Sequence, residues 1–400
     1  MDNAIEDLKN AVDMREYMER FMPDKFEGCK HVNNGDVYIC CPFHDEKTPS
    51  MLIHKERYKC FGCGESGDII DMVMKTKNES FKEACLEIAD NVGFKLHFEP
   101  PNPDYEAFKA EKLKLCRKYY ANLQKNPNAL NYLMNERRIS EDMIQKFVLG
   151  LTAPDEYKYR QDVGSISNRI VFPIFEDVRK PSIIGMAYRR LIEDSSPKYI
   201  NDPNQTGANG QNPKVAGVFT KGNVMYGMYQ ALPAIKEQGY AIVVEGYFDV
   251  ISMHQSGICN TVGTMGALMT NEQAEWLSKK TRRVMLMLDS DQAGMNGARH
   301  AAKLLLARGM DVYICTLKCH DPDELCKSEN FNGASVMSKR GEVRPAINVF
   351  VDDIVRGYED MVTKERTKAI QMSKEYEEYI TLQGQKDVFN RLLLKRLDML

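Results

Sequence analysis

Six acidic residues of this 400-residue chain stand at the ends of apolar runs, where together they could bind a metal ion. The runs cover residues 241–244, 284–288 and 312–317, and their length is typical of buried strands. Helical spacing follows the first two runs, and strands that alternate with helices predict a parallel sheet. The carboxyl ends of parallel strands meet at one edge, so we expect six side chains to meet there: Glu245, Asp249, Asp289, Asp291, Asp321 and Asp323.

These six residues, the acidic cluster, would repel one another unless a cation lay between them. Mg²⁺ is the usual partner because it is held by a few carboxylates and by substrate phosphates. An acidic residue at a single strand end is commonly a solvated loop residue, but three acidic groups at successive strand ends favour a metal site. The cluster therefore predicts a Mg²⁺ site at this edge of the sheet.

A second candidate metal site lies near the N-terminus. Cys41-Pro-Phe-His44 is followed after 15 residues by Cys60-Phe-Gly-Cys63, and two such knuckles separated by a hairpin-sized insert predict a zinc ribbon. A closed set of four ligands leaves no open position, so the zinc would be structural, with one ion per chain. It would contribute about 10 kcal/mol to folding. Three further residues are spare candidates: Cys29, His31 and Cys40.

The composition limits where such sites can act. Hydrophobic residues make up 43% of the sequence, which suffices for sizeable cores, and the net charge of −3 gives no global signal for nucleic-acid binding. No run of 18 apolar residues is present, which excludes a membrane-spanning helix, and the acidic N-terminus lacks the features of a signal peptide. We therefore expect a cytoplasmic protein without a membrane partner, whose eleven cysteines are thiols or metal ligands.

One internal stretch differs in charge from the remainder of the chain. Residues 169–221 contain eight Lys and Arg against five Asp and Glu, an excess of positive charge in a chain that is acidic overall. A basic surface beside a metal site would hold phosphates, and binding to it would depend strongly on salt. An ordinary sheet with scattered surface charges is the alternative.

Three sets of motifs resemble one family. The stretches from Cys41 to Met51 and from Cys60 to Asp68 look like the zinc-binding domain of the bacterial and phage DnaG-type primases, which touches single-stranded template. The acidic cluster resembles the TOPRIM domain shared by topoisomerases and primases. Motifs of the basic stretch follow the order of the same family, and the resemblance implies a groove for template and nucleotide phosphates lined by Arg169, Arg189, Arg190, Lys198, Tyr199, Asn201 and Lys221.

The resemblance covers nearly the whole chain and implies a multidomain protein of mixed α+β and α/β class. Residues 4–21 are expected to form one helix, and three prolines are expected to keep the linker that follows the first domain out of a helix. Five segments are predicted: a zinc-ribbon DNA-binding domain (1–98), a Pro-rich linker (99–104), the basic N-terminal half of the primase core (105–238), a TOPRIM metal-binding subdomain with a parallel sheet (239–326) and a C-terminal helical subdomain (327–400).

The resemblance implies a DNA primase. Such an enzyme is a nucleotidyltransferase of the DNA-directed RNA polymerase type, which copies single-stranded DNA into short RNA primers from NTPs during DNA replication. The expected catalytic residues are Glu245, Asp249, Asp289 and Asp291. Two alternatives stay open: a TOPRIM nuclease or topoisomerase-like enzyme, and a non-catalytic zinc-ribbon adaptor that only binds single-stranded DNA.

Two positions depart from the family pattern without removing a metal ligand. The chain has Gly266-Ala267 where the family usually has Gly-Thr, and Asp289-Ser290-Asp291 where it usually has Asp-Gly-Asp. Full-length relatives continue into a helicase-binding domain that this sequence does not reach. A replicative helicase of the primosome therefore stays open as a partner.

Overall fold

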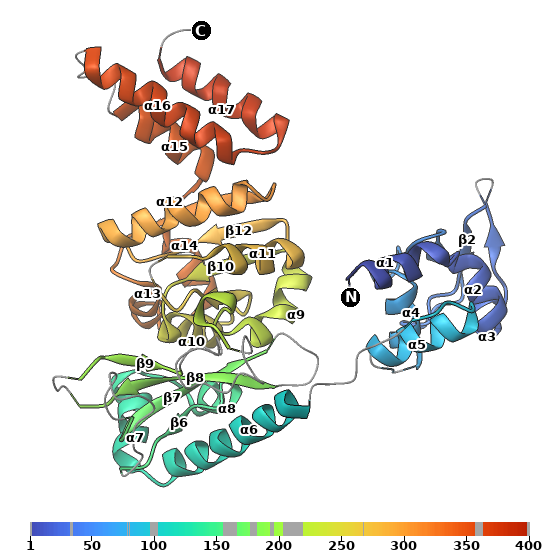
Figure 1. Ribbon diagram of the computed structural model, residues 1–400, viewed down its shortest axis with the longest axis horizontal. Helices are drawn as coiled ribbons and strands as arrows, with labels where there is room; N and C mark the ends of the chain where they lie inside the picture. Colours follow the sequence, from blue (N-terminus) through green and yellow to red (C-terminus); the bar gives the residue numbers. More distant parts are fainter. Residues whose placement is uncertain are drawn as a thin grey trace. The chain divides into compact units, whose positions relative to one another are not determined.

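The structure is a computed structural model, which describes residues 2–32, 35–77, 79, 81–96, 103–154, 166–176, 182–192, 196–202, 219–266, 268–356 and 363–397. The chain divides into two compact units, Met1–Pro101 and Asn102–Leu400, called the N-terminal unit and the core unit (Figure 1). Helix α6 begins at Pro103, so the predicted linker extends too far at its C-terminal end. Proline fits the first turn of a helix, where its missing N–H leaves no hydrogen bond unmade. Residues 99–102 lie outside the described residues.

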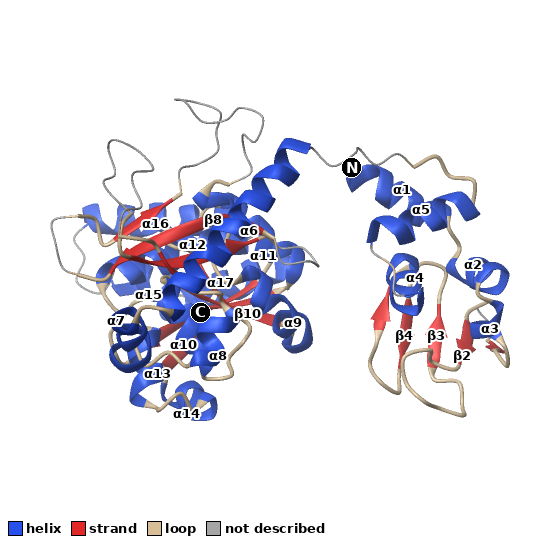
Figure 2. Ribbon diagram, turned by 90° about the horizontal axis from the view of Figure 1, so that it is seen from below, coloured by secondary structure: helices blue, strands red, loops and turns tan. Residues whose placement is uncertain are grey.

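The N-terminal unit contains a small antiparallel sheet with the strand order β1-β2-β3-β4-β5, and Figure 2 shows β2, β3 and β4 side by side. Residues 4–21 form two helices and not the one predicted, because Asp13 caps the second by accepting from the Arg15 amide at 3.0 Å. The elements are α1 (Asp2–Ala11), α2 (Met14–Phe21), α3 (Pro23–Phe26), β1 (Lys30–His31), β2 (Val37–Ile39), β3 (Met51–Ile53), β4 (Tyr58–Cys60), β5 (Ser66–Gly67), α4 (Ile69–Lys77) and α5 (Phe81–Asn91).

The core unit opens with helices that pack on an antiparallel sheet of order β6-β7-β8-β9. Every residue of β7 is buried. This apolar strand lies between its two neighbouring strands, with α6 over one face of the sheet and the parallel sheet over the other. The elements are α6 (Pro103–Gln124), α7 (Pro127–Asn131), the π-helix η1 (Tyr132–Glu136), α8 (Glu141–Lys146), β6 (Gly150–Leu151), β7 (Arg169–Phe175), β8 (Ile183–Arg190) and β9 (Tyr199–Asn201).

A second sheet, of order β11-β10-β12-β13-β14, follows in the same unit. Strands β10 to β13 are parallel, which confirms the predicted parallel sheet, and β14 pairs antiparallel to β13. The elements are η3 (Lys221–Asn223), α9 (Met228–Gln238), β10 (Tyr240–Val244), α10 (Tyr247–Gln255), β11 (Thr261–Gly263), α11 (Asn271–Lys280), β12 (Arg283–Leu286), α12 (Gln292–Leu306), β13 (Asp311–Leu317), α13 (Pro322–Ser328), α14 (Gly333–Lys339) and β14 (Gly341–Pro345).

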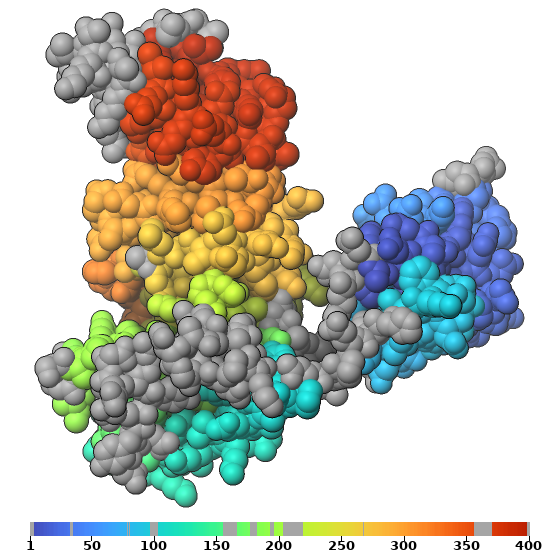
Figure 3. All heavy atoms as spheres, in the orientation of Figure 1, coloured from blue at the N-terminus to red at the C-terminus, as the bar shows by residue number. Residues whose placement is uncertain are grey.

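Three C-terminal helices close the core unit: α15 (Ala346–Arg356), α16 (Thr363–Tyr379) and α17 (Gln383–Arg396). Arg299 on α12 forms a two-bond ion pair with Asp353 on α15, at 2.6 and 2.8 Å, and Phe350 stacks on Tyr376 at 4.2 Å. Figure 3 shows these helices, in red, directly against the orange segment that contains α12. No helix in the described part of the chain is long and apolar enough to span a bilayer.

Candidate active site and metal centre

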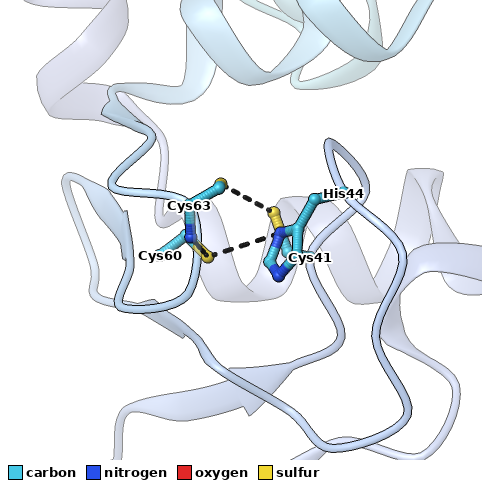
Figure 4. A group of neighbouring side chains, drawn as sticks. All are labelled: Cys41, His44, Cys60 and Cys63. Carbon is cyan, nitrogen blue, oxygen red and sulfur yellow. Dashed lines mark hydrogen bonds between the residues drawn. The ribbon is translucent and has the colours of Figure 1, made fainter.

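The four predicted zinc ligands lie together in the N-terminal unit (Figure 4). Their ligand atoms all lie within 4.8 Å of one another. Cys41 Sγ is 3.8 Å from Cys63 Sγ, and Cys60 Sγ is 3.8 Å from His44 Nδ1. Two Zn–S bonds of about 2.3 Å at a tetrahedral angle would place their sulfurs about 3.8 Å apart, so this quartet fits a zinc ion. The group does not include the spare candidates Cys29, His31 and Cys40.

Hydrogen bonds to Cys60 favour its thiolate form, whereas burial raises the pKa of Cys41 to about 12. The amides of Gly62 and Cys63 donate to Cys60 Sγ at 3.3 and 3.4 Å. Burial alone would raise the pKa of Cys60, but hydrogen bonds from Ser50 and from these amides outweigh it and bring the pKa to about 7. A Cβ atom at Gly62 would lie 2.7 Å from His44 Nε2, so glycine is required for the turn to approach the imidazole. The turn therefore supplies both a ligand and donors that stabilise its charge.

The acidic cluster lies at the carboxyl ends of the parallel strands, as the strand pattern predicts. Hydrogen bonds link its three groups, because the Asp289 amide donates to Glu245 at 3.3 Å and the Asp323 amide donates to Asp249 at 3.3 Å. One group follows β10 and enters the first turn of α10, a second follows β12, and a third opens α13: Glu245 with Asp249, Asp289 with Asp291, and Asp321 with Asp323.

Burial and mutual repulsion raise the pKa values of three of these carboxyls. Burial raises the pKa of Glu245 to about 7, with a further contribution from Asp289. Burial and the charge of Asp321 raise the pKa of Asp249 to about 8, and the same two causes raise the pKa of Asp289. Oδ1 of Asp289 is buried and has no hydrogen-bond partner among the described residues. His320 opposes these increases at Glu245 and Asp289 but does not outweigh them, and a divalent cation would supply the compensating charge.

Two members of the cluster also cap helices. Asp291 accepts from the Gly294 amide at 2.8 Å, and Asp321 accepts from the Glu324 amide at 2.7 Å. Each cap uses one carboxylate oxygen and fixes the direction of the other. Among the described residues, the zinc quartet is the one group of three or more such side chains found close enough together to share an ion. Mg²⁺ usually keeps several of its waters, so it does not need a closed set of protein ligands.

Asp323 differs from the other five acids. Its Oδ1 accepts from Ser252 at 2.5 Å, and its Oδ2 lies 2.5 Å from the Arg137 guanidinium and 2.7 Å from the Lys327 ammonium. The side chain is buried, and two cations of the chain already neutralise it. This geometry fits an anchor that holds α13 to α10 and to the segment before α8, and it leaves little of the carboxylate for direct metal binding.

Arg189, on β8, faces the first turn of α10. Its guanidinium donates to the hydroxyls of Tyr132 at 2.8 Å and Tyr199 at 2.7 Å. It also lies 5.3 Å from the centre of the Phe248 ring. Phe248 precedes Asp249 in α10, so Arg189 lies on the face of the antiparallel sheet that packs against α10, the helix that carries Asp249.

Arg169 and Arg190 lie opposite each other on β7 and β8, on the face away from Arg189. The Arg169 guanidinium donates to the carbonyl of Pro197 at 2.8 Å and to the hydroxyl of Ser196 at 2.7 Å, and Arg190 donates to the Ser196 carbonyl. Arg169 is only 2% exposed. Both guanidiniums therefore hold the segment that leads into β9.

The remaining predicted groove residues differ in exposure. Lys198 is exposed, while Asn201 accepts a hydrogen bond from the Tyr247 hydroxyl at 2.6 Å. Burial lowers the pKa of Lys221. A Cβ atom at Gly266 would lie 3.5 Å from Lys221 Nζ, which places this ammonium beside the loop after β11. Lys221 thus carries positive charge to a loop at the same sheet edge as the acidic cluster.

Comparisons with known proteins point to one family. Residues 1–103 match the CHC2 zinc finger family, and residues 242–326 match the Toprim-like family. The DNA primase of Aquifex aeolicus is 33% identical over 353 residues, which are 82% of this chain and 67% of that protein. This chain belongs to the DnaG-type DNA primase family. The DNA primase of Clostridium acetobutylicum is 30% identical over 375 residues, 85% of this chain and 59% of that protein.

Solved structures from the family share the fold. The crystal structure of the Aquifex aeolicus primase, with its zinc-binding and RNA polymerase domains, matches with a TM-score of 0.60 and 27% identity. The match covers 99% of this chain and 97% of the Aquifex chain. A DnaG primase catalytic domain bound to ssDNA matches 74% of this chain and 97% of its own, with a TM-score of 0.61 and 22% identity, which supports the fold. The predicted family and mixed fold class are confirmed, and this chain spans about two thirds of the length of the Aquifex relative.

One of the two departures from the family pattern, Ser290, lies in a loop at the acidic edge. The amide of Ser290, which replaces the family's glycine, donates to the carbonyl of His320 at 2.8 Å. This bond joins the loop after β12 to the loop after β13. Ala267 lies outside the described residues.

Two residues that contribute to the sites were not predicted. Arg137 pairs with Asp323 and lies 4.1 Å from the centre of the Phe248 ring, so it joins the helical start of the core unit to the acidic edge. Oε2 of Glu46 lies 3.2 Å from Nε2 of the predicted zinc ligand His44. Glu46 follows a ligand by two residues in the sequence, which is a local signal, whereas Arg137 and its acidic partner are 186 residues apart.

Proposed function

We propose that this chain is a DNA primase that copies single-stranded DNA into short RNA primers from NTPs, with a divalent cation. The observation that carries the proposal is the acidic cluster, whose buried carboxyls have raised pKa values and include an oxygen that has no hydrogen-bond partner among the described residues. Membership of the DnaG-type family supports the same activity. Because the chain spans only part of its relatives, the activity of this segment needs its own test.

The residues that would hold the catalytic cation are Glu245, Asp289 and Asp291, with Asp321 beside them. In the described part of the chain Oδ1 of Asp289 has no hydrogen-bond partner, and Asp291 and Asp321 each use only one oxygen, Oδ1, for their helix caps. When bound, Mg²⁺ or Mn²⁺ favours the deprotonated 3′-hydroxyl and neutralises charge on the triphosphate. Asp249 would position the loops that carry these ligands. Its carboxylate accepts hydrogen bonds from the Gly246 amide at 2.7 Å and from the backbone amide of Asp323.

Basic side chains of the core unit would bind the phosphates of template and nucleotide. Arg189 faces the acidic side, and its hydrogen bonds to Tyr132 and Tyr199 preorganise its guanidinium for a phosphate. Lys221 lies by the loop after β11, and Lys198 is exposed one residue before β9. The lowered pKa of Lys221 reflects burial, so an anion at this position would favour its charged form.

The N-terminal unit would contact single-stranded DNA and hold one structural zinc ion. Phe61 is 62% exposed on the turn between two zinc ligands, and the Lys59 ammonium lies 5.6 Å from the centre of its ring. An exposed aromatic ring beside a cation can stack on a base and attract the backbone. The fit of Cys41, His44 and Cys60 with Cys63 to a tetrahedral ion supports the zinc.

Incorporation of labelled NTPs on a panel of single-stranded DNA templates tests the proposed function. With Mg²⁺ or Mn²⁺ we expect short RNA products that depend on template and on NTPs, and no products with EDTA. Cleavage of labelled DNA without NTP incorporation would favour a TOPRIM nuclease or topoisomerase-like enzyme. Binding of single-stranded DNA with no incorporation on any template would favour the non-catalytic adaptor.

A further inference from the structure

Glu46 lies between the zinc ligand His44 and the backbone of the ligand loop. Oε2 of Glu46 is 3.2 Å from His44 Nε2, on the opposite side of the imidazole from Nδ1, which lies 3.8 Å from Cys60 Sγ. The imidazole thus turns Nδ1 toward the quartet and Nε2 toward the carboxylate. Neutral imidazole carries its proton on one nitrogen only, and a carboxylate acceptor at Nε2 favours the tautomer with the proton there.

The Glu46 carboxylate is itself held in place. Its other oxygen, Oε1, accepts from the Cys41 amide at 2.6 Å and from the Ser50 amide at 3.2 Å. The Ser50 hydroxyl in turn lies 3.3 Å from Cys60 Sγ, and the Glu46 side chain is only 13% exposed. One carboxylate therefore connects both knuckles of the zinc site, and it has little freedom to turn away from His44.

We propose that Glu46 is a positioning residue for the zinc site, acting through His44. It accepts the Nε2–H of the imidazole, so that the lone pair on Nδ1 points at the metal, and its negative charge makes this nitrogen a better ligand. The inference rests on the proposed structural zinc. Carboxylate partners of this kind typically change metal affinity by about 10–100-fold. The alternative is that Glu46 only closes the loop. In that case it would stabilise residues 41–50 equally whether position 44 held His or another ligand.

The test compares Glu46→Gln with Asp45→Asn in the full chain. Both changes remove one negative charge and keep the size of the side chain, but Asp45 is exposed and next to Glu46. Zinc stoichiometry is measured by elemental analysis, and affinity is measured by competition with a coloured chelator. We expect Glu46→Gln to lower zinc affinity by about 10–100-fold and Asp45→Asn to leave it within about twofold.

A double-mutant cycle separates action through His44 from a general effect on the loop. His44→Cys gives a four-thiolate set, which also holds structural zinc and has no N–H for Glu46 to accept. In that background we expect Glu46→Gln to change zinc affinity by less than about threefold. Absorption of the Co²⁺-loaded proteins reports whether the coordination is tetrahedral in each variant.

Each outcome decides one of the two proposals. Equal losses from Glu46→Gln with His44 and with Cys at position 44 would overturn the positioning role and leave the zinc site standing. An unchanged affinity in Glu46→Gln would do the same, even if the His44→Cys protein failed to fold. A parent protein without zinc would overturn the structural zinc, and the role of Glu46 with it. Primer synthesis is not the readout, so the proposed enzymatic activity is tested separately.

Discussion

Replacing Asp249 by Asn should make the free energy of unfolding of the metal-free core unit less dependent on pH. Burial, and then the charges of Asp321 and Asp289, raise the pKa of Asp249 to about 8 from an ordinary value of 3.8. A carboxyl with a raised pKa binds its proton more tightly in the folded state. The stability it contributes is therefore full below the unfolded pKa and is lost as pH rises towards the folded pKa.

The expected size follows from these two pKa values. Between pH 5 and pH 7 the unfolded chain has released this proton and the folded chain keeps it. Each pH unit then lowers the free energy of unfolding by up to about 1.4 kcal/mol, or about 2–3 kcal/mol over the interval. Glu245 and Asp289 also have raised pKa values. They therefore also lower the free energy of unfolding as pH rises, and they do so in the parent and in the variant alike. The difference between the two proteins therefore isolates Asp249, which is 7% exposed.

Trp276 makes the measurement specific to the core unit. It is the only tryptophan of the chain and lies in α11, so its fluorescence during denaturant unfolding does not report the N-terminal unit. In EDTA, we expect the parent to lose about 2 kcal/mol more than Asp249→Asn between pH 5 and pH 7. Asp311→Asn serves as the control, because Asp311 is an exposed residue of the same sheet. Its free energy of unfolding should depend on pH as that of the parent does. Parallel curves for parent and Asp249→Asn would refute the electrostatic description of the cluster.

Three further changes probe other parts of the structure. Cys60→Ser with Cys63→Ser should lower bound zinc from about one ion per chain to near none in elemental analysis, and it should leave the tryptophan transition of the core unit unchanged. Lys221→Ala should weaken binding of fluorescent single-stranded DNA and reduce the log–log salt slope by about 1; an unchanged slope would place this lysine outside the binding surface. Asp323→Asn should lower the free energy of unfolding by about 2 kcal/mol, because it weakens the buried pair with Arg137, and equal stability would contradict its role as an anchor.

Both groups of neighbouring side chains could be predicted from the sequence. In the zinc ribbon, two residues between candidate ligands form a tight turn, so the spacing indicated which four side chains lie together, with Cys29, His31 and Cys40 left as spare candidates. The acidic cluster was predictable for a different reason, since parallel strands bring their carboxyl ends to one edge wherever the sheet forms. The apolar run at residues 241–244 is fully buried as β10, and Glu245 follows it directly.

Partners distant in the sequence could not be predicted. Asp323 has the same spacing from Asp321 as Asp291 has from Asp289, yet it pairs with a guanidinium 186 residues away. Arg169 lies in a family motif, and only the structure shows its hydrogen bonds to the segment before β9. Whether a charged side chain faces a groove or the chain's own backbone depends on tertiary contacts that the sequence pattern does not contain.

Some element boundaries also depended on tertiary contacts. Strand β14 lies within 327–400, a segment predicted to be helical, and Glu342 and Arg344 give it no apolar alternation. It forms because β13 offers a free edge, and its charged side chains suit an edge strand. The amphipathic pattern of residues 4–21 likewise continues across Asp13, although the first helix ends at Ala11 and Asp13 caps the second.

The most direct test of the proposed active site is primer synthesis by Asp289→Asn. The change keeps the size of the side chain and removes the carboxylate whose Oδ1 is buried and has no hydrogen-bond partner within the described ranges. We expect NTP incorporation to be abolished with Mg²⁺ and with Mn²⁺, while the tryptophan transition in EDTA occurs at no lower denaturant concentration than in the parent, because one repulsive charge is gone. Added Mn²⁺ should then stabilise the variant less than the parent. Asp311→Asn should synthesise primers like the parent. Normal synthesis by Asp289→Asn would contradict metal-dependent catalysis at the acidic cluster.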